Sequence, residues 1–179
     1  MRDVTDKTTK TMVKQTLRTL FVLFLLSSNV GCDQISKGIV RQQVGDNERI
    51  SLIKNYLTLT KIENTGAFLS VGNKLPEPLK TILLTISPMI ILIGAFFYVL
   101  RVNHLSNLSI VGISCVIGGG IGNIYDRIQY GSVTDFLHID LVVFQTGIFN
   151  MADVSIMTGM SMILIDLYRR AVSADDTMS

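Results

Sequence analysis

The stretch Leu79–Leu100, LKTILLTISPMIILIGAFFYVL, carries no charge after Lys80. A helix that crosses the hydrocarbon core of a bilayer needs about 20 mostly apolar residues, so this stretch predicts a membrane-spanning helix. Pro88 within it predicts a kink, which membrane helices tolerate. The stretch therefore places the chain among membrane proteins.

The composition agrees with a membrane class. Of 179 residues, 48% are hydrophobic and 17% are charged, and the mean hydropathy is +0.44. The net charge of +2, with no run of Lys or Arg, gives no reason to expect a nucleic-acid partner. No His or Cys cluster has metal-ligand spacing, so neither a metal nor a cofactor is expected. A Cys32–Cys115 disulfide has no support, because Cys115 lies in an apolar run where a buried free thiol is common.

Three further stretches are long and apolar enough to span a membrane. They are Leu105–Tyr125 with its glycine cluster, Gly147–Tyr168 interrupted by Asp153, and Leu17 to about Val40. Glycines allow membrane helices to pack closely. The predicted fold is a membrane all-α protein of four transmembrane helices with a small β-rich periplasmic segment.

Basic residues predict the orientation of these spans. They precede the first span, occupy the link between the second and third, and close the fourth: Lys7, Lys10, Lys14, Arg18, Arg101, Arg169 and Arg170. The positive-inside tendency then puts both termini in the cytoplasm. Residues 1–16 are expected to be a cytoplasmic N-terminal segment, 17–170 the membrane domain and 171–179 a disordered cytoplasmic tail. The outer segment, about 45–78, contains a predicted strand, Tyr56–Thr60, and a predicted turn, Asn64–Gly66.

The stretch Phe21–Lys37, FVLFLLSSNVGCDQISK, has two readings. An apolar run followed by small residues and a cysteine is typical of a bacterial lipoprotein signal sequence cut before Cys32. However, Asn29, Asp33 and Lys37 are spaced four residues apart and form one polar stripe on a helix. A signal sequence has no use for such a stripe beyond its cleavage point, which favours a permanent first helix. Cleavage before Cys32 remains the alternative.

Placing an ionisable residue within a membrane segment costs free energy, so such residues are first considered as functional. Asp153 precedes the arginines that close its span by about 24 Å of helix, which puts it near the outer surface. Asn150 lies three residues earlier on the same face. Asn123 and Asp126 repeat this spacing at the outer end of the third span, and Asp135 is close enough in sequence to fold back over them.

Two neighbouring carboxylates share a proton, so one can activate a water while the other polarises a carbonyl. The chain has no Gly-x-Ser-x-Gly elbow and no His near either cysteine, which weakens the nucleophilic alternatives. Peptide hydrolysis by an aspartate pair at the membrane surface is therefore the favoured interpretation. A proton-coupled transporter or channel subunit is one alternative, although it predicts acids spread through the membrane depth. A structural protein whose amides hydrogen-bond the helices is another.

Five blocks of the sequence resemble the lipoprotein signal peptidases, the signal peptidase II family. In order, they are DQISK (33–37), NTGAF (64–68), GGGIGNIYDR (118–127), GSVTDF (131–136) and FNMAD (149–153). The resemblance runs from about residue 17 to 170. It implies an aspartic endopeptidase of the bacterial inner membrane, in contact with membrane lipids, with its active site at the periplasmic face. The implied substrates are prolipoproteins, cut on the amino side of a diacylglyceryl-modified cysteine, and the implied inhibitor is globomycin.

The resemblance also implies roles for single residues. Spacing alone would pair Asp126 with Asp153, whereas the family motifs make Asp135 and Asp153 the catalytic pair. Asp126, next to Arg127, is then expected to have a salt-bridged structural role. Implied substrate-holding or supporting residues are Asn64, Gly66, Asn123, Arg127, Asn150 and Ala152, and Asp33 with Lys37 is expected to form an ion pair that stabilises the fold. NTGAFLS departs slightly from the family pattern, which implies a local loop difference near Phe68.

Overall fold

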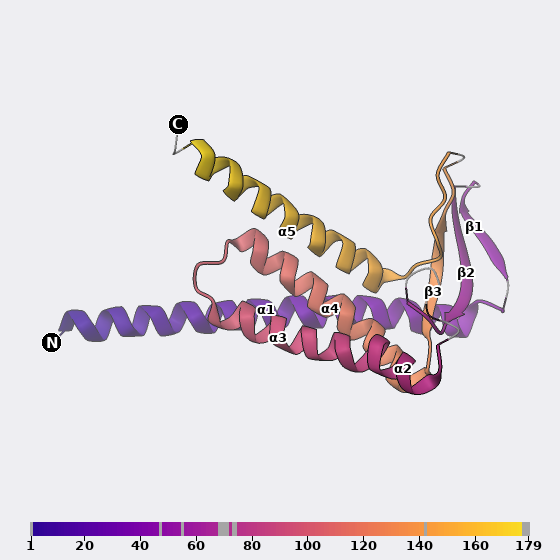
Figure 1. Ribbon diagram of the computed structural model, residues 1–179, viewed down its shortest axis with the longest axis horizontal. Coiled ribbons are helices and arrows are strands. Elements are labelled where there is room, and N and C mark those ends of the chain that lie inside the picture. The colour runs from indigo at the N-terminus through magenta and orange to yellow at the C-terminus, as the bar shows by residue number, and fades with distance from the viewer. Residues whose placement is uncertain are drawn as a thin grey trace.

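The computed structural model describes residues 2–46, 48–54, 56–67, 72, 75–141 and 143–176, and side chains between residues 12 and 175 within these ranges. Most of this chain is helical, and a small antiparallel sheet lies at one end of the helices (Figure 1). In chain order the elements are α1 (Arg2–Gln43), β1 (Arg49–Ile53), β2 (Leu57–Asn64), α2 (Glu77–Thr81), the π-helical turn η2 (Ile82–Ile86), α3 (Ser87–Arg101), α4 (Asn107–Tyr130), β3 (Val133–Ile139) and α5 (Met151–Asp176).

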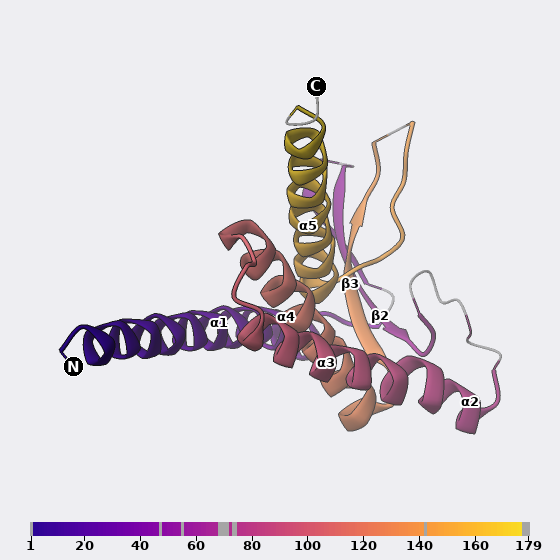
Figure 2. The same cartoon turned by 60° about the vertical axis from the view of Figure 1, so that its left-hand side comes forward.

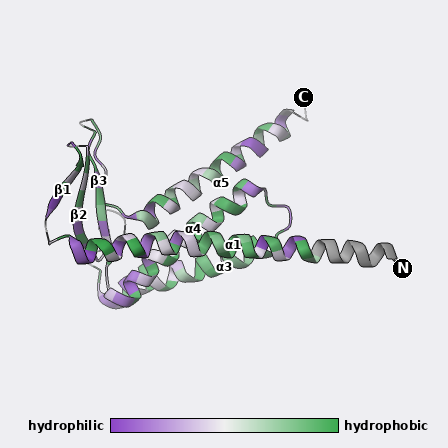
Figure 3. Cartoon of the chain, turned by 180° about the vertical axis from the view of Figure 1, so that it is seen from behind, coloured by the Kyte–Doolittle hydropathy of each residue, from purple (hydrophilic) through white to green (hydrophobic). Residues whose placement is uncertain are grey.

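Four helical segments of the described chain are long and apolar enough to cross a membrane: Met12–Gln43, Glu77–Arg101, Asn107–Tyr130 and Met151–Asp175. The predicted membrane fold with four spans and a small sheet is thus confirmed. Large apolar side chains such as Phe24, Ile91 and Leu164 are more than half exposed on the outside of the bundle. Figure 3 shows hydrophobic residues along the helices and more hydrophilic residues towards the sheet.

Helix α4 lies at the centre of the bundle and contacts α1, α3 and α5. Its glycines let α5 approach closely, as the glycine cluster predicted. A Cβ added to Gly112 would lie 2.8 Å from the backbone oxygen of Gly159, and one added to Gly119 would overlap the carbonyl of Ala152. Because real Cβ atoms do not come so near, α4 and α5 are held together by backbone-to-backbone packing.

The sheet has the order β1-β2-β3, and both neighbouring pairs are antiparallel. One face packs on the end of α1, where Leu59 and Phe136 contact the cluster that contains Val40 and Val44. The chain before α5 runs along the other edge of β3, where the N–H of Phe149 donates to the carbonyl of Leu137 at 2.9 Å. The N-terminal end of α1 and the C-terminal end of α5 lie away from the sheet (Figure 1).

Element boundaries differ from the sequence expectations most at the two ends of the chain and at the start of α5. Helix α1 begins at Arg2 rather than near Leu17, because residues 2–16 contain no Pro or Gly and continue the helix that the membrane span nucleates. Helix α5 continues through Asp176, so the expected disordered tail is wrong for residues 171–176, while 177–179 lie outside the described residues. Helix α5 also starts at Met151, four residues after the predicted Gly147.

The second span accommodates Pro88 through an altered hydrogen-bond pattern. Pro88 lies in the first turn of α3, and η2 precedes it, with the N–H of Ser87 donating to the carbonyl of Ile82 five residues earlier. Figure 2 shows α2, η2 and α3 following one another as a single rod. A π-helical turn of this kind often marks a functional position in a helix.

Candidate active site

A cavity of about 190 Å³ lies where the helices meet the sheet, and both Asp135 and Asp153 line it. Residues of β2, η2, α3, α4, β3, α5 and the segment before α5 contribute to its wall. The remaining lining residues are Asn64, Ala67, Leu84, Pro88, Asn123, Arg127 and Ile148. The cavity therefore has a polar side with two carboxylates and an apolar side formed largely by the second span.

Asp153 is held at the N-terminus of α5 by reciprocal hydrogen bonds with Asn150. The N–H of Asp153 donates to Asn150 Oδ1 at 3.0 Å, and the N–H of Asn150 donates to Asp153 Oδ2 at 3.1 Å. This is a capping box, which satisfies backbone donors that the helix itself leaves free. Asn123 Nδ2 donates to the other oxygen, Asp153 Oδ1, at 2.9 Å. Two N–H donors and the positive end of the helix dipole thus stabilise a negative charge on Asp153.

Asp135, on β3, is 4% exposed and accepts a hydrogen bond on each oxygen. Asn64 Nδ2 donates to Oδ2 at 2.9 Å, and Asn150 Nδ2 donates to Oδ1 at 2.6 Å. Burial raises the pKa of Asp135 to about 6, and the nearby charge of Asp153 raises it too, although the amide hydrogen bonds oppose both effects. The two carboxyl groups therefore differ in environment: Asp135 is buried and its pKa is raised, whereas Asp153 caps the N-terminus of α5.

Asn150 is completely buried and connects the two aspartates. Its backbone N–H and Oδ1 bind Asp153, and its Nδ2 binds Asp135 and also Asn123 Oδ1, the latter at 3.2 Å. Lys37 Nζ donates to the same Asn123 oxygen at 2.9 Å. The spacing predicted that Asn150 lies within the helix, on the same face as Asp153. In fact it caps the helix, and this frees its amide to reach β3.

Arg127 ties the turn after β2 to α4. Its Nη2 donates to the carbonyl of Gly66 at 3.0 Å, and its Nη1 donates to the carbonyl of Asn123 at 3.4 Å. Within the turn, the N–H of Gly66 donates to Asn64 Oδ1 at 2.9 Å, as the predicted turn requires. Phe68, where a loop difference was expected, lies outside the described residues.

A buried ionic cluster lies directly behind the cavity. Lys37 Nζ lies 2.8 Å from Asp33 Oδ2 and 3.0 Å from Asp126 Oδ2, and all three side chains are fully buried. The expected Asp33–Lys37 pair is confirmed. Asp126 is salt-bridged as expected, to Lys37 and to a second partner that the sequence interpretation did not indicate. Its second partner is Arg41, whose Nη2 lies 2.9 Å from Asp126 Oδ1.

The ionic cluster also reaches α5 through a backbone group. The N–H of Ala152 donates to Asp33 Oδ1 at 2.9 Å, so the first helix holds the start of the last helix next to Asp153. At Ala152 the structure uses the main chain, and the carbonyl of the same residue packs against Gly119, where a side chain would not fit. No side-chain pattern could have revealed this contact.

Two further residues that the sequence interpretation missed anchor β3. Arg41 Nε donates to Thr134 Oγ1 at 2.8 Å, and that hydroxyl donates to Glu63 Oε1 at 2.8 Å. Thr134 directly precedes Asp135 in sequence, and its N–H donates to Asp126 Oδ2 at 3.3 Å. A signal for Arg41 was present, since it continues the four-residue spacing of Asp33 and Lys37.

Within the described residues, no group of three or more His, Cys, Asp and Glu side chains is arranged to hold a metal ion. Cys32 and Cys115 are both free, so the unsupported disulfide is not formed.

Comparisons with known proteins agree with the five motifs. The family model described as signal peptidase (SPase) II matches residues 23–169. The lipoprotein signal peptidase of Streptococcus pneumoniae is 30% identical over 164 residues, which cover 92% of this chain and 100% of that protein. The lipoprotein signal peptidase of Enterococcus faecalis is 34% identical over 151 residues, covering 84% of this chain and 89% of that protein. A solved bacterial membrane enzyme superposes with a TM-score of 0.76 at 26% identity, covering 84% of this chain and 89% of that one.

Proposed function

The chain belongs to the signal peptidase II family, a family of proteases that remove signal peptides from prolipoproteins, and we propose that it does so as an aspartic endopeptidase. The substrate is a prolipoprotein, cut on the amino side of its diacylglyceryl-modified cysteine. The observation that carries this proposal is that Asp135 and Asp153 line one small cavity at the end of the membrane helices.

The two carboxyl groups take different parts in the reaction. Asp153, stabilised as a carboxylate at the N-terminus of α5, removes a proton from a water molecule as the water oxygen attacks the scissile carbonyl carbon. Asp135 acts in its protonated form, which its raised pKa of about 6 makes far more populated than for an ordinary aspartate, and donates a hydrogen bond to the carbonyl oxygen. The proton held by Asp153 then passes to the leaving nitrogen, the C–N bond breaks, and the pair again holds one proton.

Amide side chains support this division of labour. Asn64 and Asn150 fix the two oxygens of Asp135, and Asn123 fixes Asp153. Arg127 holds the Gly66 carbonyl and so fixes the turn that carries Asn64. We assign these residues to positioning of the carboxyl groups and of the substrate backbone, since each lies in or beside the wall of the cavity.

The protein is proposed to reside in the bacterial inner membrane with both termini in the cytoplasm and the active site at the periplasmic face. Supporting this, Arg101, Arg169 and Arg170 lie at the end of the bundle away from the sheet. The exposed apolar side chains of the four spans are the surface that membrane lipids would contact. Globomycin is the expected inhibitor, acting at the aspartate cavity.

A gel assay on a lipidated prolipoprotein tests the proposal. The purified protein in lipid bicelles should release the signal peptide, and globomycin should block release. Asp135→Asn and Asp153→Asn should each lose activity, by at least about 10³-fold if both carboxyls act in the chemistry. Asp46→Asn, which changes an exposed carboxylate paired with Lys61, is the matched control and should retain activity. Normal processing by either active-site variant would refute the aspartic mechanism.

A further inference from the structure

A second cavity, of about 370 Å³, lies over the open face of the sheet. We call it the sheet cavity. Asn64, Asp135 and Ile148 line both it and the active-site cavity, so the two spaces meet at Asp135. Nothing in the proposed cleavage chemistry requires the sheet cavity, and its position next to the reacting groups calls for an occupant.

Strand pairing places a row of polar side chains on the wall of the sheet cavity. Thr60 is the pairing partner of Arg49 on β1, and Thr58 is the partner of His138 on β3. All four side chains line the cavity, together with Thr146 from the segment before α5. The wall thus offers hydroxyl groups, an imidazole and one guanidinium, which suits a polar peptide with an acidic side chain.

The two cavities differ in what surrounds them. The active-site cavity is walled by Leu84 and Pro88 of a membrane span, so an apolar segment lying in the bilayer approaches from that side. The sheet cavity has no lining residue from the spans. A chain that runs through the cleavage point from the membrane therefore continues over the sheet after the scissile bond.

We propose that the sheet cavity binds the part of the substrate that follows the scissile bond, and that Arg49 gives a preference for an acidic residue there. This inference rests on the proposed peptidase function and adds a specificity-determining residue to it. The acidic side chain pairs with the Arg49 guanidinium, while the threonine hydroxyls hydrogen-bond the extended backbone.

The sheet register indicates which substrate position Arg49 reads. Arg49 lies two strands away from Asp135 and about two residues along, because their partners on β2 are Thr60 and Ile62. With about 4.8 Å between strands and about 3.3 Å per residue, the separation is about 12 Å. An extended substrate covers this in about three to four residues, and side chains shorten the path, so the acidic residue belongs at about the second to fourth position after the cut.

Kinetics with a set of lipidated prolipoprotein peptides tests the inference. The peptides carry Glu, Gln or Lys at these positions, and cleavage is compared between the wild-type protein and Arg49→Glu in bicelles. Wild type should cleave the Glu peptide with a kcat/KM about fivefold above that of the Gln peptide, a size set by a partly solvated ion pair. Arg49→Glu should reverse this order and favour the Lys peptide. The preference should shrink at high salt.

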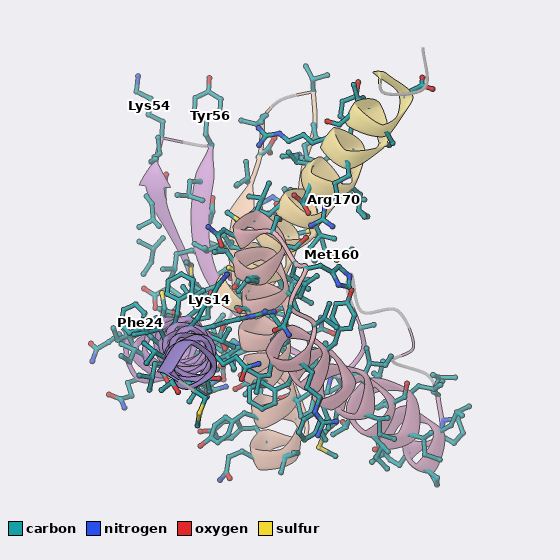
Figure 4. All side chains as sticks on the ribbon, turned by 90° about the vertical axis from the view of Figure 1, so that its left-hand side faces the viewer. Lys14, Phe24, Lys54, Tyr56, Met160 and Arg170 are labelled. Atoms are coloured by element: carbon teal, nitrogen blue, oxygen red, sulfur yellow. The ribbon has the colours of Figure 1, made fainter. Side chains whose placement is uncertain are left out.

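The matched control is Lys54→Glu, which makes the same charge change at the tip of the β1–β2 connection, away from the helices (Figure 4). It should keep the wild-type preference. If Arg49→Glu lowers cleavage of all peptides equally, or leaves their ratio unchanged, the assignment of Arg49 is overturned. Retained cleavage of the Gln peptide shows that the variant is folded. If wild type cleaves no lipidated peptide at all, the proposed function itself fails, and the inference fails with it.

Discussion

Replacing Asp135 with asparagine should abolish peptide hydrolysis and also remove a pH-dependent cost from folding. In the folded protein the pKa of Asp135 is about 6, against an ordinary value of 3.8. The folded state therefore binds this proton more tightly than the unfolded state does. The associated stability is fully present below about pH 4, is lost as the pH rises to about 6, and stays lost above that.

The size of this effect follows from the same pKa shift. A difference of about two pH units corresponds to about 3 kcal/mol of unfolding free energy. About 2 kcal/mol of this loss in unfolding free energy falls between about pH 4.5 and pH 7.5. Asparagine cannot ionise, so the variant lacks this dependence. It does leave Asn64 or Asn150 facing an NH₂ group instead of an oxygen, which costs about 1–2 kcal/mol at every pH.

Reversible unfolding by SDS in mixed micelles measures the difference. The unfolding free energy of Asp135→Asn minus that of wild type should increase by about 2 kcal/mol on going from about pH 4.5 to pH 7.5, because wild type alone loses stability over this range. Asp46→Asn, which changes a carboxylate that is 85% exposed, should show almost no such change. A difference between Asp135→Asn and wild type that is the same at both pH values would refute the argument that burial raises this pKa.

Three other outcomes are expected. The kcat/KM for prolipoprotein cleavage should fall about tenfold per pH unit above about pH 6, as Asp135 loses the proton it needs, and a flat profile between pH 6 and 8 would contradict its role as the acid. Asp126→Ala should lower the unfolding free energy by about 3 kcal/mol, because it leaves Lys37 with one buried carboxylate instead of two. A loss of less than about 1 kcal/mol in SDS unfolding would contradict this prediction. Gly119→Ala should force α4 and α5 apart, which lowers the unfolding free energy by about 1–3 kcal/mol and removes most of the activity. Gly94→Ala, with nothing within 4 Å of the added methyl group, should not destabilise the protein. Equal unfolding curves for the two variants would contradict the packing argument.

The membrane fold was predictable because the bilayer sets a length and a polarity that each span must meet on its own. The four spans and the predicted strand Tyr56–Thr60, which corresponds to the first half of β2 (Leu57–Asn64), follow from local patterns of this kind. The boundaries at Arg2 and Asp176 did not follow, since helices continue beyond the bilayer wherever no residue stops them. The π-helical turn before Pro88 also escaped prediction, because it depends on how the hydrogen bonds rearrange around the missing proline N–H.

The site was predictable to a different degree. The polar residues could be picked out because they are costly at a membrane boundary, and the spacing of Asp33 and Lys37 gave a pair that the structure confirms. The partners across helices could not be read in the same way. Asp126 turned out to pair with Lys37 and Arg41, since the helix faces that meet depend on packing at the glycines of α4. The catalytic choice of Asp135 over Asp126 remains a prediction.

The backbone contact between Ala152 and Asp33 has a consequence for how the protein is made. The chain is synthesised from its N-terminus, so α5 enters the membrane after the other three spans, and it brings Asp153 and the Ala152 N–H with it. Until then Asp33 Oδ1 lacks its Ala152 donor, and Asn123 Nδ2 lacks the Asp153 carboxylate. On the proposed mechanism, a ribosome-bound chain that has inserted only the first three spans lacks one of its two aspartates and should not hydrolyse a prolipoprotein.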